Sequence, residues 1–172
     1  MTIILDDRSV DSVFRTARRC RTWLDKSVSD TIIEALWELA RVPPTVRGNH
    51  PAQIVFVKSP EAKERLAAAL GAEEAAAALA APAVAVIGCD CTPGDDASRD
   101  ALLQAGYLIL AARALGLDCT PAAPREIAHI DRTLFSDGRA TALLICYLGY
   151  GDARDADAAA AGPGFEVACR II

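Results

Sequence analysis

Apolar and polar residues alternate along the chain in patterns that predict both strands and helices. Gln53–Val57 and Thr141–Tyr150 are short runs rich in apolar and β-branched residues, and Ala83–Gly88 is apolar throughout, as in a strand covered on both faces. Ser98–Leu115 carries apolar residues at helical spacing and ends at Gly116, so we expect a long, largely buried helix there. This mixture predicts a layered α/β or α+β domain.

Shorter helices are predicted from capping residues and helix breakers. Ser12–Arg21 is expected to be a first helix with an arginine-rich end. A second helix follows a capping box in Thr31-x-x-Glu34 and stops at Pro43-Pro44. Ser59-Pro60 supplies a cap and a first-turn proline for a helix running towards Leu79, and a last helix is predicted over Arg125–Phe135.

The remaining segments have the composition of turns and loops. Asp90–Ala97 is expected to be a polar turn, and Cys119–Pro124 a loop before the last helix. Asp152–Gly164 is rich in Ala, Asp and Gly and is predicted to be mobile, and Phe165–Ile172 is predicted to be extended. No repeat or linker interrupts the chain, so residues 1–172 are interpreted as one domain.

Charge and cysteine content narrow the classes of function. A net charge of −5 argues against a protein that binds nucleic acid or an anionic membrane. Met1–Asp7 turns acidic at once and no apolar run approaches the roughly 20 residues of a membrane span, so we expect a cytoplasmic protein. Its six cysteines are then expected to be reduced, mostly buried thiols. Cys89-x-Cys91 lacks the usual zinc spacing, and no metal site is predicted.

Arg18, Arg19 and Arg21 form the strongest chemical feature of the sequence. Guanidinium groups bind phosphate through two parallel hydrogen bonds, so this cluster suits a phosphorylated cofactor. A solvated helix face would have the same composition, and residue type alone does not separate the two interpretations. The loop from Pro43 to Pro51 offers hydroxyl, amide and imidazole groups, and it is either a binding edge or a rigid connection.

The order of several segments resembles the flavin-dependent nitroreductase family. In that family an arginine-rich element precedes an aromatic residue and a D-K-x-V string, and a Pro-Thr loop, a first sheet strand, a long central helix and a late strand end follow. The matching segments are Arg18–Asp30 (RRCRTWLDKSVSD), Pro43–Thr45 (PPT), Pro51–Val57 (PAQIVFV), Gln104–Asp118 (QAGYLILAARALGLD) and Leu148–Asp152 (LGYGD). Among the branches of the family, the chain looks most like the malonic semialdehyde reductases.

The resemblance implies an α+β fold in which helices flank a central antiparallel or mixed sheet. It also implies non-covalent FMN at a homodimer interface, with hydride passing from NADH or NADPH through the flavin to a small aldehyde, nitro or enone-type substrate. It assigns phosphate, ribityl and ring-edge contacts to Arg18, Arg19 and Arg21, contacts from the partner subunit to Thr45 and Asn49, and backbone contacts with the isoalloxazine to Pro121, Ala122 and Ala123. It assigns no catalytic acid, and protons are expected from water or substrate.

Departures from the family pattern support an alternative function. The family's loop asparagine falls on Gly48, with Asn49 next to it, and a backbone donor falls near Pro124, which has no N–H. Ala158–Gly164 replaces basic residues, and Cys89–Ala97 replaces a longer segment that covers the flavin. The alternative is a flavin-free protein of this fold that binds another ligand or a partner. Either protein is expected to dimerise, because the apolar helix through Leu102–Leu115 exceeds what a small sheet can cover.

Overall fold

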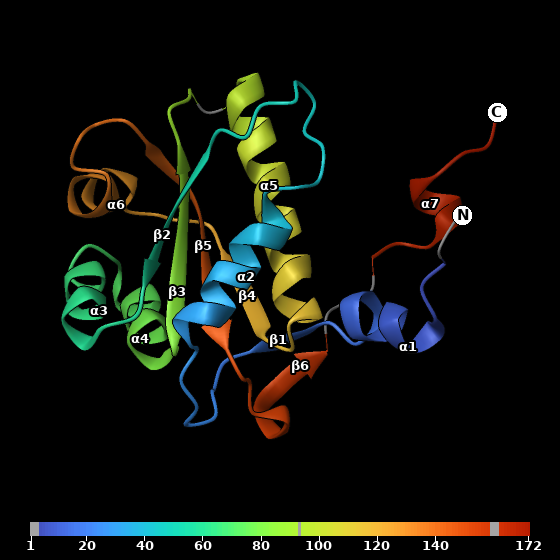
Figure 1. Ribbon diagram of the computed structural model, residues 1–172, viewed down its shortest axis with the longest axis horizontal. Coiled ribbons are helices and arrows are strands. Elements are labelled where there is room, and N and C mark those ends of the chain that lie inside the picture. The colour runs from blue at the N-terminus through green and yellow to red at the C-terminus, as the bar shows by residue number, and fades with distance from the viewer. Residues whose placement is uncertain (1–3, 93, 159–161) are drawn as a thin grey trace.

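A four-stranded antiparallel sheet forms the centre of the molecule (Figure 1). The computed structural model describes residues 4–92, 94–158 and 162–172. The strand order is β2 (Ala52–Val57), β3 (Ala83–Cys89), β5 (Thr141–Gly149) and β4 (Asp118–Ala122), and each neighbouring pair is antiparallel. The α+β class and the three predicted strands are confirmed. The predicted loop over Cys119–Pro124 is wrong as far as Ala122, because this segment forms the edge strand β4.

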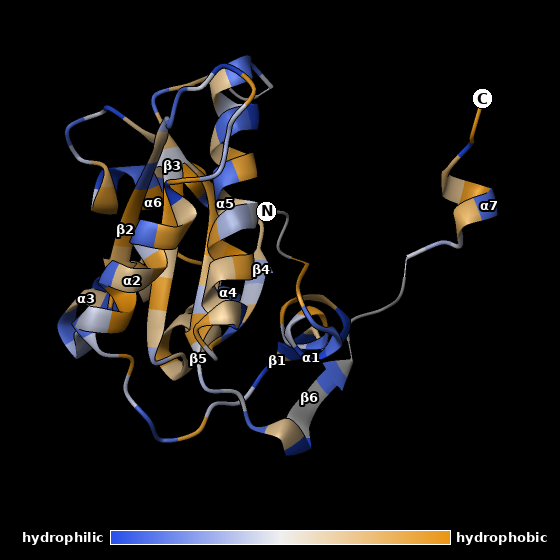
Figure 2. Ribbon diagram, turned by 45° about the vertical axis from the view of Figure 1, so that its right-hand side comes forward, coloured by the Kyte–Doolittle hydropathy of each residue, from blue (hydrophilic) through white to orange (hydrophobic). Residues whose placement is uncertain are grey.

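Helices cover both faces of the sheet (Figures 1 and 2). All seven residues of β3 are buried, and they alternate between the two faces, as strand geometry requires. Ile87 packs with Leu36 of α2 (Asp30–Ala40) and Leu108 of α5 (Asp96–Ala114). Val86 packs on the opposite face with Ile130 of α6 (Ile127–Leu134) and with residues of α3 (Pro60–Ala67) and α4 (Ala72–Ala80).

Several helix boundaries differ from the predicted ones for local reasons. The second helix is capped by Ser29, whose hydroxyl accepts from the N–H of Ile32 at 3.3 Å, so the capping box at Thr31 is wrong. The helix predicted from Pro60 to Leu79 is two helices, because Gly71 adopts an extended conformation as the cap of α4. Helix α5 begins before Ser98, at a cap formed by Asp95, whose carboxylate accepts from the N–H of Ser98 at 2.7 Å.

The predicted first helix, Ser12–Arg21, is wrong in its second half. Helix α1 (Asp7–Val10) continues into a π-helical turn, η1 (Asp11–Arg15), and the chain then extends as β1 (Arg18–Cys20). Strand β1 pairs with β6 (Ala156–Ala158) in a separate two-stranded sheet. The helix ends where it does because the guanidinium of Arg113 on α5 binds the carbonyl oxygens of Val13 and Ser12, at 2.7 and 2.9 Å.

The C-terminal tail also contains regular structure. A short 3-10 helix, η2 (Ala153–Asp155), precedes β6, and α7 (Phe165–Ala168) follows, so the prediction that residues 165–172 are extended is wrong for its first four residues. Part of the segment predicted to be mobile, residues 159–161, lies outside the described residues. Figure 2 shows α7 well away from the sheet and its helices.

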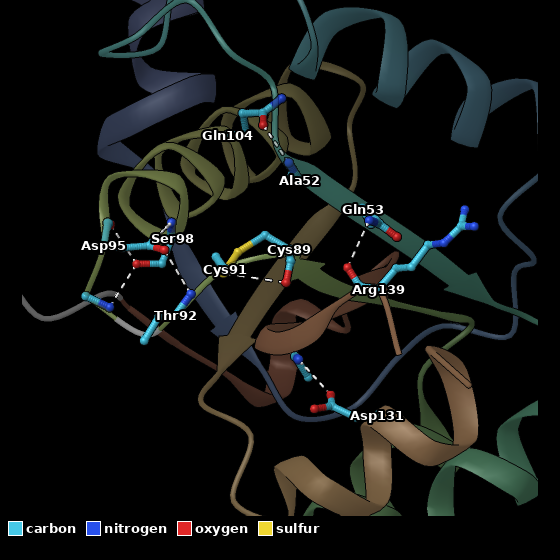
Figure 3. Close-up of a disulfide and its surroundings, with 12 residues drawn as sticks. Ala52, Gln53, Cys89, Cys91, Thr92, Asp95, Ser98, Gln104, Asp131 and Arg139 are labelled. Carbon is cyan, nitrogen blue, oxygen red and sulfur yellow. Dashed lines mark hydrogen bonds between the residues drawn. A yellow bond between two sulfur atoms is a disulfide. The ribbon is translucent and has the colours of Figure 1, made fainter. Parts of the chain in front are cut away.

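Cys89 and Cys91 are joined by a disulfide at the end of β3 (Figure 3). Their Cα atoms are 5.3 Å apart, a normal separation for such a bond, so the expectation of reduced thiols is wrong for this pair. Cys20, Cys119 and Cys146 are buried free thiols, and Cys169 is an exposed one. In the described part of the chain, no helix combines the length and apolar character needed to span a membrane.

Candidate functional site

The three arginines predicted to bind phosphate line one cavity. Strand β1 carries Arg18 and Arg19, and Arg21 follows it. The cavity has a volume of about 630 Å³, within the range of roughly 300–1,000 Å³ that is typical of small-molecule sites. The other lining residues come from η1, the segment that follows it, α5, β4 and β6, and they are mostly apolar: Val13, Phe14, Ala17, Ile109, Leu110, Arg113, Cys119, Thr120, Pro121 and Asp157.

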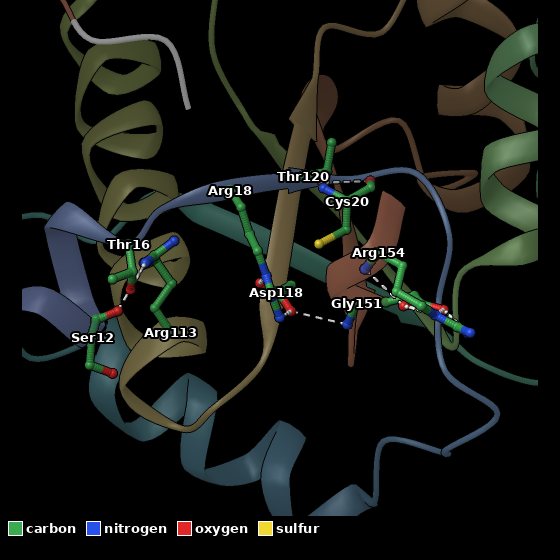
Figure 4. Close-up of polar contacts among 10 residues, drawn as sticks. Ser12, Thr16, Arg18, Cys20, Arg113, Asp118, Thr120, Gly151 and Arg154 are labelled. Atoms are coloured by element: carbon green, nitrogen blue, oxygen red, sulfur yellow. Dashed lines mark hydrogen bonds and ion pairs between the residues drawn. The ribbon is translucent and has the colours of Figure 1, made fainter. Parts of the chain in front are cut away.

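Arg18 is held by Asp118, the first residue of β4 (Figure 4). Its Nε and Nη2 donate to the two carboxylate oxygens of Asp118 at 2.9 and 2.8 Å, and the N–H of Gly151 donates to the same carboxylate at 3.0 Å. The hydrogen bond to Asp118 raises the pKa of Arg18, so this guanidinium stays charged. Burial of Asp118 opposes its ionisation, but the bonds from Arg18 and Gly151 outweigh that effect and lower the pKa of Asp118 below 3.8.

The other two arginines are more accessible. Arg21 pairs with Asp157 of β6 at 2.7 Å, and the two side chains are 71% and 64% exposed, so solvent screens this ion pair strongly. Arg19 is exposed and lines the cavity beside them. Because surface ion pairs are weak, an anionic ligand can replace Asp157 as the partner of Arg21 at little cost.

Polar side chains of β4 hold β1 in place beside the cavity, and the sequence alone does not predict this role for them. The hydroxyl of Thr120 accepts from the N–H of Cys20 at 3.2 Å and donates to the carbonyl of Cys20 at 3.1 Å, which joins β1 to β4 (Figure 4). Burial, with the neighbouring Asp118 carboxylate, raises the pKa of the Cys20 thiol. In the sequence, Asp118 directly follows the apolar residues that end the long helix, and a charged residue buried there requires a partner.

The loop predicted to contact flavin from a partner subunit lies at the other end of α5. Thr45 is buried, and its hydroxyl donates to the carbonyl of Asn49, which is exposed. The buried carboxylate of Asp100 accepts from the backbone N–H groups of Val46 and Arg47, at 2.9 and 3.3 Å. These bonds keep the loop against the N-terminal half of α5.

Gln104 and Tyr107 extend this attachment along α5. The amide oxygen of Gln104 accepts from the N–H of Ala52 at 3.0 Å (Figure 3), and its nitrogen lies 3.2 Å from Nδ1 of His50. Tyr107 donates its hydroxyl to the carbonyl of Pro44 at 2.8 Å. The loop from Pro43 to Pro51 is therefore hydrogen-bonded to α5, and whether it serves as a binding edge or as a rigid connection stays a prediction.

The predicted cofactor residues thus fall into two groups that one chain keeps apart. Asp100, which holds the loop, and Arg113, which lines the arginine cavity, are 13 residues apart on α5, or about 20 Å along a helix. Of the predicted backbone contacts, Pro121 lines the cavity. Ala122 packs against the core on the α6 face of the sheet, and Ala123 is exposed just after β4.

No family model matches the chain. A protein of Ralstonia nicotianae named "Putative NADH dehydrogenase/NAD(P)H nitroreductase" is 33% identical over 192 residues, and the match covers 98% of each chain.

Solved structures share the fold at lower sequence identity. A gut-bacterial enone reductase of fatty acid biohydrogenation has a TM-score of 0.83 and 15% identity, and the match covers 98% of this chain and all of that one. An FMN-dependent nitroreductase of Clostridium difficile has a TM-score of 0.71 and 21% identity, over 82% of this chain and 87% of that one. With a relative that is one-third identical along nearly its whole length, the chain belongs to the nitroreductase family.

Proposed function

We propose that this protein is an FMN-dependent oxidoreductase that uses NADH or NADPH to reduce a small electrophile of the aldehyde, nitro or enone type. The observation that carries the proposal is the cavity of about 630 Å³ with three arginines on a largely apolar wall. The names of the relatives support it, since they include NAD(P)H nitroreductases, an FMN-dependent nitroreductase and an enone reductase. The resemblance to malonic semialdehyde reductases makes a small aldehyde the first substrate to test.

The residues of the cavity fit FMN in their chemistry. FMN has a phosphate dianion at one end, which arginines bind well, and a planar apolar ring system at the other. Ile109, Leu110 and Pro121 supply an apolar surface in the same cavity as the guanidinium groups. When bound, the flavin supplies hydride transfer, and the protein contributes binding, orientation and the exclusion of water.

Each arginine has a different part in this proposal. Arg19 and Arg21 are exposed and supply positive charge. Arg18 has two of its five N–H groups on Asp118, so three are left for the phosphate or ribityl oxygens. Pro121 lines the cavity at the edge of the sheet, and its proposed part is a contact with the isoalloxazine.

We also propose that the protein works as a homodimer. Thr45 and Asn49 are held at the far end of α5 from the arginines, so they reach the same flavin only from a second copy. Leu102 and Leu103 of α5 are 45% and 37% exposed, and large apolar side chains near the C-terminus are exposed as well, which gives a second copy apolar surface to cover. Sedimentation should show a dimer at micromolar concentration, and a stable monomer would contradict this arrangement.

The absorbance spectrum of the purified protein tests the cofactor. We expect yellow protein with about one FMN per subunit, and Arg18→Ala or Arg21→Ala should weaken FMN binding by about ten- to a hundredfold. Arg15→Ala is the control, because Arg15 pairs with Asp11 and Asp7 at the surface and lies outside the cavity lining. Equal FMN affinity in the wild type and an Arg18/Arg21 double mutant would exclude the phosphate assignment.

The alternative is a flavin-free binding protein of the same fold. One observation favours it: Arg18 and Arg21 both already have carboxylate partners, as arginines with a purely structural role would. The same spectrum separates the two functions. A colourless protein whose spectrum is unchanged after incubation with FMN would support the alternative.

A further inference from the structure

We propose that Asp118 is a positioning residue: its carboxylate fixes the guanidinium of Arg18 so that the remaining N–H groups are kept for the phosphate of a bound flavin nucleotide. This inference rests on the proposed function. It assigns to Asp118 control over how strongly the site prefers a phosphorylated flavin to an unphosphorylated one.

The geometry around Asp118 restricts Arg18 to one orientation. Two parallel hydrogen bonds, from Nε and Nη2, fix both the position and the plane of the guanidinium, which a single bond would not do. The carboxylate is itself anchored by the N–H of Gly151, and its side chain is only 14% exposed. Arg18 is therefore held before any ligand arrives, and less side-chain entropy is lost on binding.

Asp118 acts through Arg18 and does not itself reach the main cavity. Arg18 lines both the cavity of about 630 Å³ and a smaller one of about 280 Å³ beside it, whereas Asp118 lines only the smaller one. A ligand in that cavity therefore meets Arg18 and not Asp118.

Neutralising Asp118 should change phosphate binding in opposite directions, depending on whether the charge of Asp118 or its positioning of Arg18 matters more. The carboxylate offsets the charge of Arg18, so its removal should strengthen attraction for a phosphate if charge alone matters. If positioning matters, the same change releases the guanidinium and weakens phosphate binding. The positioning role is the one the geometry favours, because Arg19 and Arg21 already supply charge at the same cavity.

The test compares affinities for FMN and for riboflavin, which lacks the phosphate, by flavin titration. We expect Asp118→Asn to lower the preference for FMN over riboflavin by about tenfold while riboflavin affinity changes less than about twofold. Asp157→Asn is the matched control, because it removes one carboxylate beside Arg21, at an exposed pair in the same cavity. There the preference for FMN should not fall.

A double mutant shows whether Asp118 acts through Arg18. In an Arg18→Ala background, Asp118→Asn should leave the FMN preference unchanged, because the group it positions is gone. If Asp118→Asn abolishes binding of both flavins by unfolding the protein, Asp118→Glu takes its place. Glu keeps the charge but displaces the guanidinium, and it should also lower the preference.

The outcomes separate this inference from the proposed function. An unchanged or increased FMN preference in the Asp118 variants, or an equal loss in the Arg18→Ala background, overturns the positioning role while FMN binding stands. A wild-type protein that binds neither flavin overturns both proposals.

Discussion

The two ends of helix α5 hold candidate site residues in different ways. At its N-terminal half, buried Asp100 and Gln104 accept hydrogen bonds from backbone N–H groups of the loop. Near its C-terminal end, Arg113 binds the carbonyl oxygens of Ser12 and Val13, whereas the cavity arginines Arg18 and Arg21 form ion pairs with residues on β4 and β6. The loop end is fixed by groups that no ligand can replace, whereas the arginine end uses charges for which an anion can compete.

Because the two ends are held by different kinds of contact, salt and mutations should affect them differently. Buried hydrogen bonds depend little on salt, whereas an exposed ion pair such as Arg21–Asp157 is screened by it. Mutations at the loop end should therefore act mainly on folding. Mutations at the arginine end should act on folding and on anion binding together.

The largest effect is expected from Asp100→Ala at the loop end. It removes two backbone hydrogen bonds to a buried carboxylate, each worth about 1.5–3 kcal/mol, so the free energy of unfolding should fall by about 3 kcal/mol. Urea denaturation measures the loss. Asp96→Ala, which removes only surface ion pairs with Arg47 and Arg99, should cost less than about 1 kcal/mol. Equal losses would mean that burial of Asp100 has no special importance.

The arginine end should be broken by Gly151→Ala. A Cβ built there lies 2.8 Å from Cβ of Cys20 and 2.9 Å from Oδ2 of Asp118, so these residues of β1 and β4 must move away from position 151, at a cost of about 2–3 kcal/mol by overpacking. Gly106→Ala in α5 is the matched control. Its Cβ meets nothing within 4 Å, and alanine favours the helix by about 0.5–1 kcal/mol. In chemical denaturation, the free energy of unfolding should fall for Gly151→Ala and rise for Gly106→Ala.

The Asp118–Arg18 pair should make stability depend on acidity. Because the pKa of Asp118 is below 3.8 in the folded protein, the pair stabilises above that value, and the stabilisation is lost as the pH falls through the folded pKa. At pH 7, Asp118→Asn should lower the free energy of unfolding by about 2 kcal/mol, since a bidentate charged contact is lost. Unfolding curves at a series of pH values should show the two proteins converging below about pH 4. A constant difference down to pH 2 would contradict this assignment.

The smallest effect is expected from the disulfide at the loop end. For so short a loop the chain-entropy model gives a stabilisation of about 1–2 kcal/mol, so Cys91→Ser should lose that amount. Adding reductant should destabilise the wild type by the same amount and leave Cys91→Ser unchanged. Cys169→Ser, at an exposed free thiol, is the control. If reductant has no effect on the wild type, the bond does not form in solution.

Local patterns predict the elements whose own residues carry a clear period and clear ends. Strands β2, β3 and β5 and helix α5 were found because their apolar residues are periodic and their ends carry clear breakers. The sequence of strand β1 has a helical pattern because arginine favours helices, and its partner strand lies more than 130 residues away in sequence. The sequence of strand β4 has a loop pattern because it contains Pro121, which an edge strand tolerates.

Only part of the site can be predicted from composition. The arginines and the polar loop stood out by composition, and the structure brings Arg18, Arg19, Arg21 and Pro121 to one cavity. Asp118 was missed because its pairing with Arg18 spans 100 residues. Asp100 and Gln104 were missed because they lie among apolar residues of α5, where sequence alone does not show which backbone groups they serve.

The pairing of β1 with β6 makes the part of the cavity that carries the arginines able to open locally. It joins Arg18–Cys20 to residues 156–158, outside the four-stranded sheet, and a two-stranded ribbon has little stability alone. Amide hydrogens of this ribbon should therefore exchange with solvent through local opening, well before those of β3. A ligand that binds only when the ribbon is paired stabilises the pairing by mass action. Saturating ligand should therefore slow exchange in β1 and β6 together and leave exchange in β3 unaffected.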